Sequence, residues 1–204
     1  EMSASLVGSE MCIRDRRETE NQLQILLCEL AAYLHNKDME INVWDRIIAF
    51  EGRMHEFIKA AYDYQDNTFH SHPGYYIDYF EMRLAQLQVL HNLHYEIKKI
   101  RKMPKQALVI ADYIMYMADY VVEMNIPDQQ IEKLEEISEQ MKQEELPKTR
   151  EEFEGRALLY HILMDLEEFL VYKKRFVNGL DEKKLRIYWK QEMEQKDSAN
   201  ELQK

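Results

Sequence analysis

Apolar side chains recur every three or four residues along most of this chain, which is the spacing of one face of an α-helix. The pattern appears in six stretches, over residues 17–36, 43–64, 75–101, 104–124, 127–145 and 150–178. The stripe of the first stretch is Leu23, Leu26, Leu27, Leu30 and Leu34. No stretch alternates Val, Ile and Thr with a period of two, so no β-strand is expected.

Boundary signals separate the six stretches, and the few glycines and prolines mostly lie between them, as expected for long helices with short connections. Asn42 is a good N-cap for the second helix. Thr149, with Glu152 three residues later, forms a capping-box signature for the sixth helix, which Gly179 is expected to end. Long antiparallel helices joined by short links predict an all-α fold, an up-down bundle of about five to six helices.

The first residues differ in character from the rest of the chain. Residues 5–16 read as the in-frame translation of a transposase sequencing adapter. We therefore expect residues 1–16 to be non-native and disordered, and the chain to be a fragment of a longer open reading frame. A genuine disordered N-terminus is the other interpretation. Residues 17–180 are expected to form one helical domain, and residues 181–204 a charged tail with a short helix followed by disorder.

The net charge and the length of the apolar runs bear on whether the chain binds nucleic acid or crosses a membrane. The formal net charge is −11 at pH 7, which argues against nucleic acid because nonspecific binding to nucleic acid needs a basic surface. The most apolar run, residues 107–122, contains two aspartates and is shorter than a membrane span of roughly 20 residues. Cys28 is the only cysteine outside residues 1–16, which favours a reducing compartment. The sequence therefore indicates a soluble domain.

Motifs for catalysis, cofactors and metals are missing from the sequence. It has no Gly-x-Ser-x-Gly, no P-loop and no glycine-rich dinucleotide turn, so neither an enzyme nor a cofactor is expected. No glutamate is followed three residues later by histidine, the pair that builds di-iron sites in helical bundles. His91 and His94 share a helical face without a third ligand at zinc spacing. We therefore interpret His94 as a core or boundary histidine and His91 as exposed.

The segment of residues 75–83 combines aromatic and charged side chains, with Arg83 at the edge of an apolar helix face. A partly buried arginine needs a carboxylate or carbonyl partner. The favoured interpretation is an ion pair between helices that fixes their register. Its partner is expected from the sixth helix, which offers Glu154, Asp165, Glu167 and Glu168. The other interpretation is a site for an aromatic carboxylate, with Arg83 on the carboxylate and Tyr76 and Tyr79 against the ring.

Three motifs carry a family resemblance. They are Tyr-x-Asp-Tyr-Phe-Glu-Met-Arg-x-x-Gln at 76–86, Arg-Ala-Leu-Leu at 156–159 and Leu-Glu-Glu-Phe-Leu at 166–170. Over roughly residues 20–178 the chain resembles the C-terminal domain of putative aromatic acid exporters. These are bacterial membrane proteins of the aromatic acid exporter and fusaric acid resistance superfamily.

The resemblance implies a non-enzymatic role in transport, assembly or gating, on the cytoplasmic face of the bacterial membrane. It implies as partners a missing N-terminal transmembrane domain of the same chain, further copies in a homo-oligomer, and an aromatic carboxylate. Two basic clusters, within residues 98–105 and 173–186, suit contact with anionic headgroups, although bases are also favoured at helix C-termini in general. The alternative is a free-standing cytosolic helical adaptor or ligand-binding module. Long apolar runs upstream of residue 17 would distinguish the exporter from the adaptor.

Overall fold

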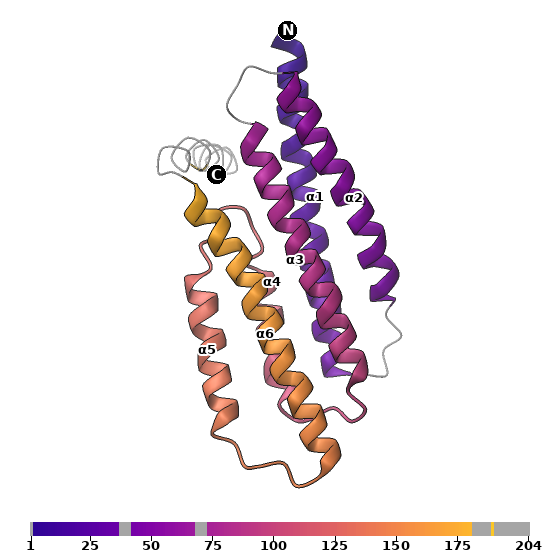
Figure 1. Ribbon diagram of the computed structural model, residues 1–204, viewed down its shortest axis with the longest axis vertical. Helices are drawn as coiled ribbons and strands as arrows, with labels where there is room; N and C mark the ends of the chain where they lie inside the picture. The colour runs from indigo at the N-terminus through magenta and orange to yellow at the C-terminus, as the bar shows by residue number, and fades with distance from the viewer. Residues whose placement is uncertain (1, 37–41, 68–72, 181–188, 190–204) are drawn as a thin grey trace, which may run out of the picture.

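The computed structural model describes residues 2–36, 42–67, 73–180 and 189. This part of the chain folds into an elongated bundle of six α-helices without a strand (Figure 1). The helices are α1 (Met2–His35), α2 (Val43–Asp66), α3 (Pro73–Lys99), α4 (Ala107–Ala118), α5 (Asp128–Lys142) and α6 (Arg150–Gly179). The all-α bundle expected from the apolar spacing is confirmed.

The helices run alternately up and down the long axis of the bundle (Figure 1). Helix α3 is central, since it packs extensively against both α2 and α6, while α1 packs mainly against α4 and α2. Helix α5 is peripheral and rests mostly on α6. Because α1 and α3 run in the same direction, the connection from α3 to α4 lies at the end of the bundle far from residue 2 (Figure 1).

Helices α2 and α6 begin at the residues that the sequence predicted as their N-caps. The side chain of Asn42 accepts a hydrogen bond from the Asp45 amide (3.3 Å), and that of Thr149 accepts one from the Glu152 amide (3.1 Å). The Glu152 carboxylate in turn accepts a hydrogen bond from the amide of Lys148 (2.9 Å), one residue before the cap. The end of α6 differs from expectation, because Gly179 stays in the helix without a positive φ.

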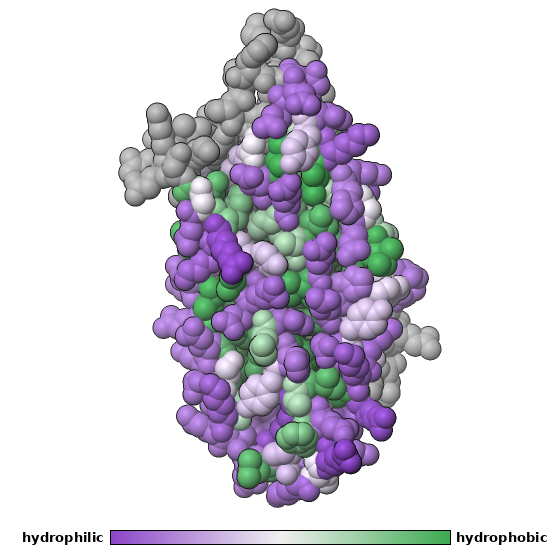
Figure 2. Space-filling view, in the orientation of Figure 1, coloured by the Kyte–Doolittle hydropathy of each residue, from purple (hydrophilic) through white to green (hydrophobic). Residues whose placement is uncertain are grey.

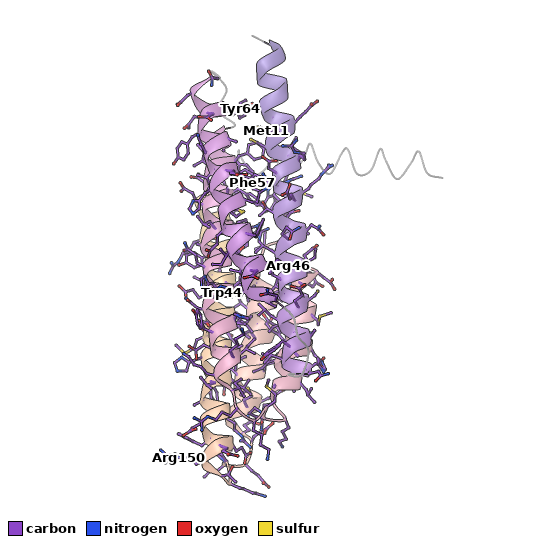
Figure 3. The ribbon with its side chains drawn as sticks, turned by 90° about the vertical axis from the view of Figure 1, so that its right-hand side faces the viewer. Met11, Trp44, Arg46, Phe57, Tyr64 and Arg150 are labelled. Carbon is purple, nitrogen blue, oxygen red and sulfur yellow. The ribbon has the colours of Figure 1, made fainter. Side chains whose placement is uncertain are left out.

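Helix α1 begins at Met2 and not near residue 17. Residues 2–16 are therefore helical in the structure, which differs from the disorder that we expected. The segment is helical because it packs against the bundle: Cys12 is buried, and a Cβ on Gly8 would lie 2.3 Å from a ring carbon of Tyr64. Figure 3 shows this α1–α2 pair, with Met11 and Tyr64 near the end where residue 2 lies. The adapter origin of the segment stays a prediction, and the expected tail at 181–204 lies outside the described residues apart from Trp189.

Helix α4 is shorter than the predicted 104–124, and turns and bends follow it to residue 127. The first bonds after the helix join residues three apart, from Tyr120 to Met117 and from Val121 to Ala118. The carbonyls of Val122 and Glu123 turn to the ammonium group of Lys173 on α6. This non-helical segment, residues 119–127, lies beside the polar cluster described below.

The interior is built from the predicted apolar stripes. Leu23, Leu26, Leu27, Leu30 and Leu34 of α1 are all buried. On the face in Figure 2, polar side chains predominate and apolar ones are scattered between them, as on ordinary soluble surfaces. None of the described helices combines the length and the apolar character needed to cross a membrane.

Candidate functional site

The clearest unusual feature of the interior is a buried arginine. Arg83 on α3 is 1% exposed, and its guanidinium lies 5.0 Å from the ring centroid of Tyr79, one turn earlier. Its Nε donates a hydrogen bond to the Tyr79 hydroxyl (3.0 Å), and its Nη1 donates to Oε1 of Gln86 (2.8 Å). The Gln86 amide in turn donates to the Phe169 carbonyl of α6 (2.7 Å). Arg83 and Gln86 therefore join α3 to α6 through hydrogen bonds.

The acidic partner of Arg83 comes from α1. Oε1 of Glu20 accepts a hydrogen bond from the Tyr79 hydroxyl (3.0 Å) and lies 3.9 Å from Nη2 of Arg83. The prediction of a partner on the sixth helix was wrong. Two of the four acids of α6 are engaged elsewhere: Glu154 pairs with Arg150, and Glu168 accepts from Tyr172.

A second buried ion pair lies next to the first. Arg16 of α1 pairs with Glu123, which follows α4, and both side chains are buried. Oε1 of Glu123 also accepts a hydrogen bond from the Tyr75 hydroxyl (2.5 Å), and the indole of Trp189 donates to that hydroxyl (3.4 Å). The pair therefore connects α1, α3 and the 119–127 segment.

Lys173 of α6 supplies a third buried cation. It is 3% exposed, and its ammonium lies 5.9 Å from the ring centroid of Tyr79. Its described hydrogen-bond acceptors are the two backbone carbonyls of Val122 and Glu123. Burial lowers the pKa of Lys173 well below its usual range, and the neighbouring Arg83 lowers it further.

We call these residues the polar cluster: Arg16, Glu20, Tyr75, Tyr79, Arg83, Gln86, Glu123 and Lys173. Burial raises the pKa values of Tyr75 and Tyr79 far above that of a free phenol. Both hydroxyls therefore stay protonated and act as hydrogen-bond donors to carboxylates. Such a set of groups holds charges and fixes helix register.

The three residues of the predicted ligand site are only partly brought together. Tyr79 and Arg83 are in contact, whereas Tyr76 is half-buried and packs at the side, stacked on Phe80 with 6.5 Å between ring centroids. A small cavity adjoins Arg83, in which the centre of a water molecule can move through about 10 Å³. This is roughly the room of one water molecule and is too small for an aromatic acid. The ligand role of the three residues stays a prediction.

Other members of the cluster were not singled out from the sequence. Lys173 was grouped with a basic cluster, because its neighbours Lys174 and Arg175 are also basic. Glu123 was placed inside a helix that in fact ends earlier. Tyr75 and Gln86 did carry a signal, since Tyr75 opens the aromatic segment that ends at Arg83 and Gln86 closes the motif at 76–86.

The histidine pair does not form a metal site with the described residues. His94 is buried, and burial lowers its pKa. His91 is half-buried, with Nδ1 3.2 Å from Oε1 of Glu51. Within the described ranges, no group of three or more His, Cys, Asp or Glu side chains is arranged to hold a metal ion.

Two grooves mark the described surface. The larger, about 680 Å³, lies between α1 and the end of α4 and includes Ile25, Cys28 and Asp119 in its walls. The smaller, about 280 Å³, lies between α5 and α6 and includes Glu135 and Met164. Neither groove contains a residue of the polar cluster.

Comparison with known proteins places these features in a family. Over 79% of this chain, the sequence is 26% identical to the "Uncharacterized protein YqjA" of Bacillus subtilis (strain 168), and the match covers 50% of that protein. The chain thus spans about half the length of this relative. A crystal structure of a "putative membrane protein" from Clostridium difficile 630 has the same fold, with a TM-score of 0.73 at 24% identity, covering 81% of this chain and 96% of that one.

The family model of the putative aromatic acid exporter C-terminal domain matches residues 11–174. The match includes all three motifs noted in the sequence and every member of the polar cluster. It also begins within the segment that reads as an adapter. The chain belongs to the putative aromatic acid exporter C-terminal domain family.

Proposed function

We propose that this chain is the cytoplasmic, non-enzymatic helical domain of an exporter-type membrane protein and that it acts in assembly or gating. The family match over residues 11–174 carries the proposal. The B. subtilis relative supports it, because half of that protein's length lies outside the match. That length leaves room for a membrane-embedded part.

The first helix offers a means of coupling the bundle to the membrane part of the protein. Beyond the segment that reads as an adapter, helix α1 continues from residue 17 to His35, which corresponds to roughly 28 Å at 1.5 Å per residue. It brings Glu20, which lies beyond the segment that reads as an adapter, into the polar cluster, where it meets Tyr79 and Arg83 of α3. If α1 moves along its axis, these contacts must break and others must form. The movement is therefore resisted until the helices reach a second packed arrangement. We therefore assign α1 the role of linking the membrane part to the bundle.

The proposed orientation directs the residue 2 end of α1 toward the membrane. The basic cluster at 98–105 then lies at the far end of the bundle, as α3 runs in the same direction as α1 (Figure 1). In the second cluster Lys173 is buried. The proposal therefore does not rest on headgroup contacts by these two clusters.

The chemistry of the site supports a non-enzymatic role. The charged groups of the polar cluster are buried, apart from the partly exposed Glu20, and are held by one another and by backbone carbonyls. Both phenols have raised pKa values. The adjoining cavity has the size of a water molecule. These features suit an element that fixes positions, because a catalytic group has to reach a substrate.

The test uses the whole protein in bacterial cells. A C-terminal fluorescent fusion should be active in the membrane fraction and a C-terminal alkaline phosphatase fusion inactive, because phosphatase folds only outside the cytoplasm. Cells lacking the gene should accumulate more benzoate than cells carrying it. Active phosphatase would overturn the cytoplasmic assignment, and equal accumulation would overturn the transport assignment for this class of compound.

Coupling through α1 has its own matched pair of variants. Glu20→Gln weakens the contact with Arg83, while Glu18→Gln alters a residue on the surface of α1 that pairs with Arg53 of α2. We expect Glu20→Gln to reduce efflux several-fold at unchanged membrane abundance, and Glu18→Gln to leave it unchanged. Equal effects of the two variants would remove the polar cluster from the mechanism.

A free-standing adaptor is the second candidate, and the α1–α4 groove favours it. Its volume of about 680 Å³ falls within the range of small-molecule sites. Recovery of the whole protein from the soluble fraction would select this function over the first.

A further inference from the structure

The larger surface groove follows one face of α1, beyond the segment that reads as an adapter. Its α1 residues recur at helical spacing, which places them on a single face of the helix, and the end of α4 forms the other side. The wall residues are Asn21, Gln24, Ile25, Cys28, Glu29, Ala32, Ala118 and Asp119. The cysteine and the alanines are small, so the groove between the two helices stays open.

The outer face of α4 continues this groove and is unusually apolar. Leu108, Val109 and Met115 are each between 45% and 46% exposed, while Ile110 and Ile114 are buried inside the bundle. A helix that is apolar on all sides is normally covered on all sides. Within the described ranges, however, α4 packs mainly against α1 and only slightly against α5. Its outer face therefore has no partner in the described part of the chain.

Two aspartates interrupt this apolar face. Asp112 and Asp119 are seven residues apart, which is about two helical turns, so they lie on the same side of α4 as Met115. Neither forms an ion pair with a lysine or arginine of the described ranges, and Asp112 meets only the imidazole of His35 (3.0 Å). The acids of the face are therefore not compensated by a strong cation.

The thiol of Cys28 reports the same negative potential inside the groove. Burial raises the pKa of Cys28, and the neighbouring carboxylates of Asp119 and Glu29 raise it further. We call the groove and the outer face of α4 together the α1–α4 surface. It is an apolar surface with acidic groups along its length.

The chemistry of the α1–α4 surface restricts what can cover it. Apolar positions with two acids about two turns apart are complementary to an amphipathic segment that carries Lys or Arg at matching spacing. A second copy of the same surface does not meet this requirement, because it is also acidic and would bring like charges together. The cytoplasmic stretches of membrane proteins, by contrast, are enriched in Lys and Arg.

We propose that the α1–α4 surface binds a basic, amphipathic cytoplasmic segment in the membrane part of the same protein, whose Lys or Arg side chains pair with Asp112 and Asp119. The inference rests on the proposed function and names the partner through which the bundle contacts the membrane part. Half of the B. subtilis relative lies outside the match, which leaves room for such a segment. Docking there acts on the same helix that carries Glu20 into the polar cluster.

Photochemical cross-linking in the whole protein tests the docking. The photoreactive amino acid benzoylphenylalanine replaces Gln24, which is half-buried in the groove wall, and membrane vesicles are irradiated. Mass spectrometry should find the probe joined to a Lys- or Arg-containing cytoplasmic segment of the same chain. The matched probe replaces Met164, which is 64% exposed on α6 and lies outside the groove. It should not join that segment.

Charge-reversal variants test the ion pairs. Asp112→Lys combined with Asp119→Lys should lower the yield of the Gln24 cross-link on the order of tenfold, because two attractive contacts become repulsive. Glu132→Lys combined with Glu136→Lys changes the same number of charges on the exposed face of α5 and should leave the yield unchanged. Equal yields in the two double variants would overturn the inference.

The identity of the cross-linked product separates this inference from the proposed function. Mixed isotope-labelled and unlabelled protein shows whether the product joins one chain or two copies. For a protein found in the membrane fraction, a link to a second copy, a link to another protein, or no link would overturn the docking and leave the proposed function standing. Recovery of the whole protein from the soluble fraction would overturn both.

Discussion

The interior of the bundle has two levels that are built from different chemistry. Toward residue 2, the helices meet through the polar cluster, where α1, α3 and α6 contribute buried charges and phenols. Farther along α1 and α3, the same helices meet through aliphatic side chains, such as Leu27, Leu90 and Leu163. Both levels are closely packed, but only the second is a conventional hydrophobic core.

The difference shows what each level contributes to the fold. Aliphatic packing gives stability with little direction, and side chains of similar volume can replace each other there. Buried ion pairs add little net stability compared with apolar packing, but they are costly to break one partner at a time. The aliphatic level therefore holds the helices together, while the polar level fixes how α1 lies along α3.

The largest expected effect comes from breaking the polar level at Arg83. Arg83→Leu keeps much of the volume but leaves Glu20 without its cation and Gln86 without its donor. We expect a loss of about 3–5 kcal/mol in the free energy of unfolding. Urea unfolding followed by circular dichroism measures the change.

A combined variant separates charge from packing. Replacing the set together, as Glu20→Leu, Tyr79→Phe and Arg83→Leu, removes the ion pair and the hydroxyl that links its members. Most of the loss should then be recovered, because no charge remains without its partner. A triple variant no more stable than Arg83→Leu would contradict the distinction between the two levels.

In the aliphatic level, Leu90→Ala should cost about 3 kcal/mol. Leu90 is fully buried, and the loss combines the transfer of its methyl groups to water with the cavity left behind. Leu108→Ala on α4 is the matched control, since Leu108 is 46% exposed and its loss should stay within about 0.5 kcal/mol. Similar losses for the two leucines would mean that burial does not decide the effect.

The aliphatic level could be predicted from the sequence in large part, less well on α2, where the buried face includes Val43, Phe50 and Phe57 and leaves Ile48 exposed. Its residues recur with the helical period, so the spacing that located the helices also selected the buried faces. The start of α6 was predictable as well, because a threonine followed three residues later by a glutamate is the sequence signature of a capped helix start. Local patterns thus determined most of the fold.

The polar level was predictable only in part. The position of Arg83 on an apolar face indicated that it needs an acidic partner. Helices α1 and α6 both carry acids, however, and the spacing of residues along α3 does not show which of these helices brings its acid next to Arg83. Lys173 reads like its exposed neighbours Lys174 and Arg175. Its acceptors are backbone carbonyls of the 119–127 segment, which a sequence does not mark. These contacts arise from how the helices pack and not from local pattern.

Asp165 offers a smaller test, because it is a carboxyl without a partner beside the aliphatic level. Its Oδ2 is buried with no hydrogen-bond partner among the described residues. Burial raises the pKa of Asp165 to about 6, and Glu96 and Glu168 add to the shift. The folded state therefore holds the proton more tightly than the unfolded state. The resulting stabilisation is complete below pH 4 and is lost as the pH rises through about 6.

Asp165→Asn should remove this dependence. At pH 7 the variant should be more stable than the original chain by on the order of 1 kcal/mol, after allowing for solvent screening of a half-buried group. Near pH 4 the two should be equal. Urea unfolding at a series of pH values measures the difference, and parallel profiles would show that Asp165 does not titrate differently in the folded state. Such a result would also remove the contrast between Asp165 and Glu20, whose carboxylate accepts a hydrogen bond from Tyr79.

The smallest effect is expected at the start of α6, away from both levels. Thr149→Ala removes the acceptor for the Glu152 amide, and the exposed position puts the cost at about 0.5–1 kcal/mol. Thr149→Ser keeps the acceptor and should leave the stability nearly unchanged, because serine caps a helix at least as well as threonine. Because the cap lies outside the interior, its loss should leave the near-ultraviolet circular dichroism of the buried tyrosines unchanged, whereas Arg83→Leu should alter it. A tyrosine signal that changed equally in both variants would mean that the polar level responds to general loosening of the bundle, and it would then lose its separate role in fixing α1 against α3.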